Sequence, residues 1–127
     1  MDTKTNALNW FEIPATDFNR AKNFYETIFG IKMEETEMMG TRMGFFPYEP
    51  GNGKAAGAIC HGTMYKPSKD GVTVYLNGNP DLSNALTKVE KAGGKITMPK
   101  TQITPDVGYM ALIEDSEGNK VALHSQN

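Results

Sequence analysis

Hydrophobic residues recur at helical spacing in two stretches of the chain. The first stripe consists of Phe18, Ala21, Phe24, Tyr25, Ile28 and Phe29, and the second of Leu82, Ala85, Val89 and Ala92. Asp17 stands just before the first stripe, where its carboxylate can accept hydrogen bonds from the free amides of a first helical turn. Gly30 follows it and allows the left-handed conformation that often ends a helix. These patterns predict helices over about residues 17–30 and 81–94.

Short runs rich in aromatic and β-branched residues predict strands around these helices. Residues 65–71, which include Pro67 and Asp70, are typical of a linker. Residues 115–119 form a tight turn, and we assign no chemistry to Asp115 or Glu117 within it. The predicted strands cover residues 8–15, 34–39, 42–47, 58–62, 72–76, 95–98, 108–114 and 120–125.

The chain contains an internal repeat of about half its length. Asp17 and Asp81 each open a stretch that reaches a glycine 13 residues later, and the two copies lie 64 residues apart in a chain of 127. Each half follows the order strand, helix, strand, strand, strand. A single domain of 127 residues can bury a substantial core, whereas a half of roughly 60 residues would be marginal. We therefore predict an α+β fold of two tandem βαβββ modules that share a core, module 1 at about 7–63 and module 2 at about 71–126.

Composition excludes several classes of partner. The net charge is −2 and the lysines and arginines are scattered, which argues against nucleic acid as a partner. No apolar run approaches the roughly 20 residues that a membrane-spanning helix needs. The first residues lack the hydrophobic segment of a signal peptide, and the only cysteine, Cys60, cannot form an intrachain disulfide. We expect a cytoplasmic protein that forms a C2 homodimer, the commonest assembly for such a chain.

Three segments resemble the vicinal oxygen chelate superfamily, which includes glyoxalases, bleomycin-resistance proteins and extradiol dioxygenases. They are Phe11-Glu12-Ile13-Pro14-Ala15-Thr16-Asp17, the pairs Phe24-Tyr25 and Phe29-Gly30, and Asp115-Ser116-Glu117-Gly118-Asn119-Lys120. The resemblance covers nearly the whole chain, in the right order and with the right repeat. It implies that the modules curl into a cupped, half-barrel mixed sheet with a ligand in its central cleft.

The resemblance also implies a divalent metal, held by a histidine on the first strand and a glutamate on the last strand of each module. At these four positions the chain has Trp10, Ile59, Thr73 and Ala122, none of which can bind a metal. We therefore expect no metal cofactor of the usual kind. A divalent metal bound at shifted positions stays an alternative.

Residues two apart on a strand share a face. If the four positions of the expected metal ligands face the cleft, the side chains two residues away from them face it too. Glu12, His61 and His124 each lie two residues beyond such a position, and an offset of 63 would make the two histidines equivalent. These three are the candidate catalytic residues. Cys60 should then point away from the cleft. The candidate ligand-binding residues are Trp10, Thr73 and Tyr75.

Three functions fit these residues. The first is binding of a small, partly apolar molecule without chemistry, which the loss of all four metal positions beside an aromatic cleft favours. The second is a lyase or isomerase in which Glu12 or a histidine takes a proton beside a carbonyl. The third is a metal enzyme that uses Glu12, His61 and His124 as a relocated site.

Overall fold

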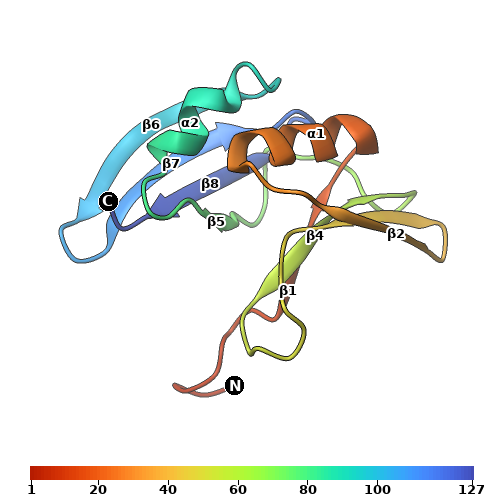
Figure 1. The fold of residues 1–127 in the computed structure, drawn as a ribbon, viewed down its shortest axis with the longest axis horizontal. Helices are drawn as coiled ribbons and strands as arrows, with labels where there is room; N and C mark the ends of the chain where they lie inside the picture. The colour runs from red at the N-terminus through yellow and green to blue at the C-terminus, as the bar shows by residue number, and fades with distance from the viewer.

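Both modules fold in the predicted order in the computed structural model, which describes all residues from 1 to 127. Module 1 contains β1 (Trp10–Pro14), α1 (Phe18–Phe29), β2 (Glu34–Met38), β3 (Thr41–Phe45) and β4 (Ala56–His61). Module 2 contains β5 (Tyr75–Asn77), α2 (Ser83–Val89), β6 (Lys95–Thr104), β7 (Gly108–Glu114) and β8 (Lys120–Ser125). The predicted α+β class of two βαβββ modules is confirmed (Figure 1).

Each module builds its own four-stranded mixed sheet. The strand order is β1-β4-β3-β2 in the first sheet and β5-β8-β7-β6 in the second. In both, the first and last strands of the module pair in parallel, and the other neighbours are antiparallel. Figure 1 shows the two helices side by side, with the sheet of module 2 to the left and the sheet of module 1 to the right.

Local signals set the bounds of α1. The Asp17 side chain accepts from the amide of Arg20 at 3.0 Å, and Gly30 adopts φ 62° at the end of the helix, as predicted. Helix α2 is shorter than predicted and lacks a side-chain cap of its own. Two bonds hold the start of this helix: the Ser83 amide donates to Asp81 Oδ1 at 2.9 Å, and the Leu82 amide donates to Ser125 Oγ on β8 at 2.9 Å. The bond to Ser125 is long-range, so no pattern within the helix could reveal it.

Only β7 and β8 have the predicted bounds, and the other strands differ in length from the prediction, β6 most of all. Strand β5 begins only at Tyr75, although the Ala122 amide on β8 still donates to the Val74 carbonyl at 2.9 Å. Strand β6 continues to Thr104, and its pairing with β7 is interrupted by three register shifts. Such bulges let a long strand bend along its neighbour.

The modules share one hydrophobic core. Seventeen buried residues form a continuous cluster that includes Phe24 and Ile59 from module 1 and Leu82 and Leu123 from module 2. A second, smaller cluster of Met43, Ala58 and Cys60 lies on the other face of the first sheet. The helices therefore cover one face of each sheet.

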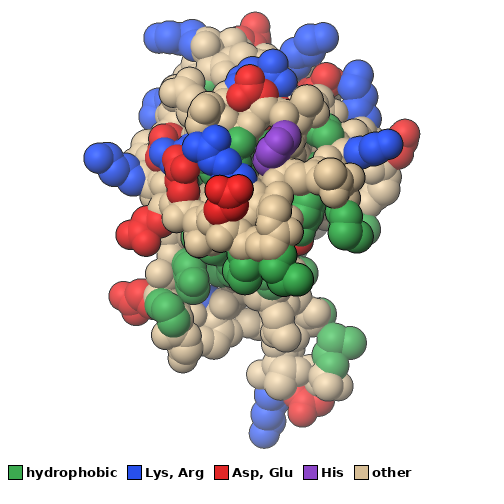
Figure 2. All heavy atoms as spheres, turned by 90° about the vertical axis from the view of Figure 1, so that its right-hand side faces the viewer, with side chains coloured by type: hydrophobic (Ala, Val, Ile, Leu, Met, Phe, Trp, Pro, Cys, Tyr) green, Lys and Arg blue, Asp and Glu red, His purple; other side chains and the backbone are tan.

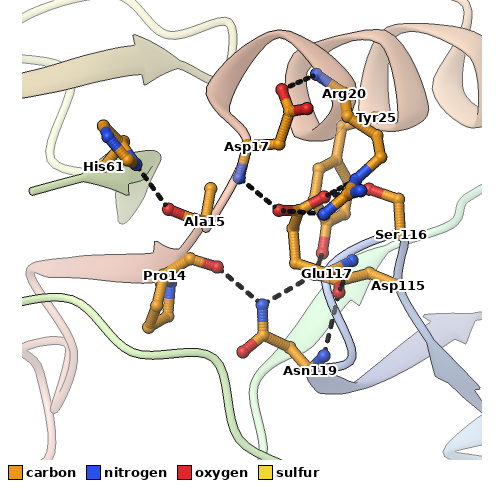
Figure 3. Close-up of polar contacts among 10 residues, drawn as sticks. All are labelled: Pro14, Ala15, Asp17, Arg20, Tyr25, His61, Asp115, Ser116, Glu117 and Asn119. Atoms are coloured by element: carbon orange, nitrogen blue, oxygen red, sulfur yellow. Dashed lines mark hydrogen bonds and ion pairs between the residues drawn. The ribbon is translucent and has the colours of Figure 1, made fainter.

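A polar cluster at the turn 115–119 joins the modules (Figure 3). Asp115, only 3% exposed, accepts from Tyr25 Oη on α1 at 2.6 Å and from the Asn119 side chain at 3.0 Å. Asn119 Nδ2 also donates to the Pro14 carbonyl on β1 at 2.7 Å. Burial, and then the charge of Asp115, raise the pKa of Tyr25 well above its usual value, so the phenol stays a donor. The turn is thus a structural junction.

The same turn binds the start of α1 through Glu117. Its carboxylate accepts from the Asp17 amide at 2.7 Å and from Arg20 Nε at 2.7 Å. Burial alone would raise the pKa of Glu117, but the hydrogen bonds from Arg20, Asp17 and Ser116 hold it below its usual value. Glu117 is therefore ionised in the folded protein and ties module 2 to α1.

Tyr25→Phe tests the junction. The change leaves the buried Asp115 carboxylate with one donor fewer, so we expect a loss of about 1.5–3 kcal/mol in the free energy of unfolding, measured in urea. Tyr65→Phe is the matched control, because it removes a phenol-carboxylate bond of 2.7 Å at an exposed site. Its cost should stay near 0.5 kcal/mol. Equal losses in the free energy of unfolding for the two variants would contradict the role of Tyr25 and Asp115 in joining the modules.

Glu117→Gln tests the pH dependence of the same contact. Because the pKa of Glu117 is lowered on folding, its stabilisation is fully present above the unfolded value near 4.5. It is lost as the pH falls through the folded pKa. The wild type should therefore be more stable than the variant at pH 7, and the gap should close below about pH 4.5. A gap that is constant from pH 7 to pH 3 in urea unfolding would refute the role.

Candidate functional site

The face of the first sheet turned away from α1 carries Trp10 and Glu12, and we call it the open face. The register places Glu12 beside Ala58, and Ala58 beside Phe45, so these three side chains form a row on one side of the sheet. Phe11, between Trp10 and Glu12, points to the opposite side by strand alternation. The open face therefore takes its polar group and its rings from β1 and β3.

Glu12 is bonded to two neutral donors on this face. Trp10 Nε1 donates to Glu12 Oε2 at 3.3 Å, and Tyr65 Oη donates to Glu12 Oε1 at 2.7 Å. The hydrogen bond to Glu12 is the main cause that raises the pKa of Tyr65 to about 12. Tyr65 is thus a neutral donor at physiological pH. Sequence reasoning missed Tyr65, since it lies in the linker beyond β4.

Cys60 also lies on the open face, which corrects the expectation that it points away from Trp10 and Glu12. It pairs with Pro14 on β1 and Met43 on β3 and is fully buried among side chains there. Burial, and then the charge of Glu12, raise its pKa to about 12. The thiol is therefore not a nucleophile.

His61 lies on the opposite face from Glu12, so the expectation that they share a cleft is wrong. Its neighbour two residues back, Ile59, is buried in the core under α1, and His61 Nδ1 is 3.0 Å from the Ala15 carbonyl (Figure 3).

The wrong expectation came from treating the two histidines as equivalent positions of the repeat. The Ala15 amide donates to the Cys60 carbonyl, as the Gly78 amide does to that of His124. His124 is thus the counterpart of Cys60 and not of His61. Shifting the alignment of two strands by one residue moves each side chain to the opposite face of the sheet.

In module 2, three predicted residues share a face as expected. Tyr75 pairs with Ala122, and Asn77 with His124, so Tyr75, Ala122 and His124 point to one side of the second sheet. His124 Nε2 lies 2.7 Å from the Val107 carbonyl in the β6–β7 turn. His124 lines a hollow of about 480 Å³ together with Tyr75, Asn77 and Ile103.

A larger cavity of about 690 Å³ lies between the modules, and we call it the seam cavity. It contains the candidate ligand residues Thr73 and Tyr75 but not Trp10, Glu12, His61 or His124. Phe11, Phe29 and Phe46 were missed by sequence reasoning. The lining residues are Leu8, Phe11, Phe29, Ile31, Phe46, Pro47, Ala55, Ala56, Gly57, Val72, Thr73, Val74, Tyr75, Leu76, Asn77 and Asn79. The alternation that places Trp10 on the open face could have assigned Phe11 to this side.

The residues present do not fit a divalent metal. The structure has no group of three histidine, cysteine, aspartate or glutamate side chains able to hold a metal ion. The relocated site of Glu12, His61 and His124 is therefore wrong as a three-ligand centre, because its members come from both faces of one sheet and from a second sheet. With the structural register, Ala58 replaces Ile59 as the counterpart of Ala122. It cannot bind a metal either.

Comparison with known families and structures agrees with this fold. The family described as the Glyoxalase/Bleomycin resistance protein/Dioxygenase superfamily matches residues 7–123. The chain belongs to this superfamily.

Named relatives are glyoxalase-like. A putative glyoxylase, CFP32, from Mycobacterium bovis is 30% identical over 122 residues, which is 94% of this chain and 45% of the relative. A glyoxylase-like domain-containing protein from Didymella fabae is 30% identical over 119 residues and covers 91% of each chain. The chain thus spans about half the length of the mycobacterial relative.

Among solved structures, a glyoxalase I variant from Zea mays has a TM-score of 0.72 at 19% identity, covering 93% of this chain and 46% of the maize chain. The antibiotic binding protein TnmS3 from a Streptomyces species has a TM-score of 0.66 at 19% identity, covering 99% and 100%. These likenesses show the fold alone. In the structure, neither helix has the length and hydrophobicity needed to cross a bilayer.

A metal titration tests whether the protein binds a divalent metal. After treatment with chelator, Zn²⁺, Ni²⁺, Mn²⁺ or Fe²⁺ should leave the thermal midpoint unchanged, because no three ligands converge. A metal bound at 100 times its dissociation constant would add about 2.7 kcal/mol, on the order of ten degrees for a domain of this size. A shift of that size, abolished in the double variant His61→Ala/His124→Ala, would restore a metal site.

Proposed function

We propose that this protein binds a small, partly apolar and uncharged organic molecule in the seam cavity, without a metal. The observation that carries the proposal is the chemistry of the lining. Eleven of its 16 residues are hydrophobic, and none is an aspartate, glutamate, lysine, arginine or histidine. Its volume of about 690 Å³ falls within the range of roughly 300–1,000 Å³ typical of small-molecule sites.

The two walls of the cavity differ in polarity. Module 1 supplies aliphatic and aromatic side chains, among them Phe11 and Phe46, whose rings lie 5.6 Å apart at 42°. The polar side chains Thr73, Asn77 and Asn79 come from the opposite wall. Such a cavity favours a molecule with one apolar side and with hydroxyl or carbonyl groups along the other. A charged ligand would lose its hydration without an ion partner.

A binding role also agrees with one relative of the same fold, TnmS3, which is described as an antibiotic binding protein. The lyase or isomerase prediction has less support, because Glu12, His61 and His124 do not share one face. None of them lines the seam cavity. We therefore propose no acid-base reaction for this chain.

A neutral fluorescent probe tests the proposal. N-phenyl-1-naphthylamine should bind saturably at one molecule per chain, detected by its increase in fluorescence. Ala55→Trp, which places an indole on the cavity lining, should weaken binding by about tenfold or more, since filling the site removes apolar contact area. Thr87→Trp, on the exposed side of α2, is the control and should leave binding unchanged.

A charged analogue tests the uncharged character of the site. The anion 8-anilinonaphthalene-1-sulfonate should bind about tenfold more weakly than the neutral probe, because the lining offers its sulfonate no cation. Binding that does not saturate, or that Ala55→Trp leaves unchanged, would refute the cavity as the site. Equal binding of both probes would retain the cavity but refute its preference for neutral molecules.

A further inference from the structure

Three aromatic rings lie together on the open face of module 1. The centroid of Trp10 is 5.9 Å from that of Phe45 and 6.0 Å from that of Tyr48, and Phe45 and Tyr48 are 6.2 Å apart. The planes meet at angles between 51° and 78°. Trp10 is 36% exposed and Tyr48 48% exposed. On the side of the molecule that the first sheet forms, Figure 2 shows hydrophobic side chains in a band below a strongly charged upper region.

Glu12 places a negative charge beside these rings without a cation to balance it. The carboxylate belongs to none of the ion pairs in the structure. Its two donors, Trp10 and Tyr65, are both neutral. Glu12 also contributes to raising the pKa of its neighbours Tyr65 and Cys60, each to about 12. Glu12 therefore leaves this face with a negative charge that no ion pair balances.

Aromatic faces and a carboxylate attract the same kind of ligand. The ring quadrupole attracts a cation that lies within about 6 Å of the centroid. A carboxylate adds a full charge of the same sign, and rings in contact with the ligand exclude water from one side of it. A quaternary ammonium group suits such a place, because its methyl groups pack against rings and need no hydrogen-bond acceptor.

We propose that Trp10, Phe45, Tyr48 and Glu12 form a binding site for a small organic cation of the alkylammonium class. The rings contact the methylated ammonium group, and the Glu12 carboxylate, held in place by Tyr65, supplies the opposite charge. This site is separate from the seam cavity, whose lining contains none of these four residues. The two sites therefore select ligands of different charge, and each can be tested without the other.

The sole tryptophan of the chain reports directly on this site. Choline and 3,3-dimethylbutan-1-ol have nearly the same shape and differ in the charge at the quaternary centre. Titrated against Trp10 fluorescence, choline should bind saturably and at least about tenfold more tightly than the neutral alcohol, since cation-π and ionic contacts apply to choline alone. Glu12→Gln should reduce the choline affinity by about tenfold while it preserves side-chain shape.

Tyr48→Leu should also weaken choline binding, whereas Tyr109→Leu should not. Tyr109 is the matched control, because it is a tyrosine on β7 of module 2 and lines neither the seam cavity nor the hollow beside His124. Equal affinity for choline and the neutral alcohol would reduce the site to an apolar patch and overturn the proposal. So would the absence of a saturable change in Trp10 fluorescence. A choline response that disappears as the protein doubles in mass at higher concentration would assign the open face to a second copy of the chain instead.

Discussion

The buried carboxylate of Asp115 fixes the relation between the modules. An aspartate that is almost removed from water is costly unless its oxygens are hydrogen-bonded. Here the side chains of Tyr25 and Asn119 donate to Oδ2, and the amides of Glu117 and Asn119 donate to Oδ1. Asn119 extends the network, since it also binds the Pro14 carbonyl and the Ser68 amide. One turn therefore holds α1, β1 and the linker to module 2. The seam cavity depends on this junction, because its walls belong to the two modules that the junction holds together.

The sequence could predict the elements but not this junction. Asp17 and Gly30 act within a few residues of the helix that they bound, so local pattern revealed them. Asp115 and Glu117 stand in a Gly-containing turn, where acidic residues are usually solvated. Their partners lie about 90–100 residues away along the chain. A single sequence carries no sign of such distant contacts, so these residues read as ordinary turn residues.

The candidate site shows how a small error in register changes a functional interpretation. The helices repeat with an offset of 64, and the ends of β4 and β8 keep that offset, with Cys60 matching His124. The first strands are offset by 63, since Ala15 matches Gly78. Applying the smaller offset to the last strands made His61 and His124 equivalent. The alternation rule was right in module 2, and in module 1 it correctly placed Trp10 and Glu12 on one face.

Successive side chains of β1 point to opposite faces of the sheet, so this one strand contributes to both proposed sites. Phe11 lines the uncharged seam cavity, while Trp10 and Glu12 point to the open face. By the family resemblance, Trp10 stands where a metal-binding histidine would be expected, and an indole cannot bind a metal. The negative charge of Glu12 is met only by two neutral donors. A hydrogen bond from a phenol or an indole spreads the charge but does not cancel it. In the proposed cation site, the unpaired charge of Glu12 therefore attracts cations, and the rings around it favour one that carries methyl groups.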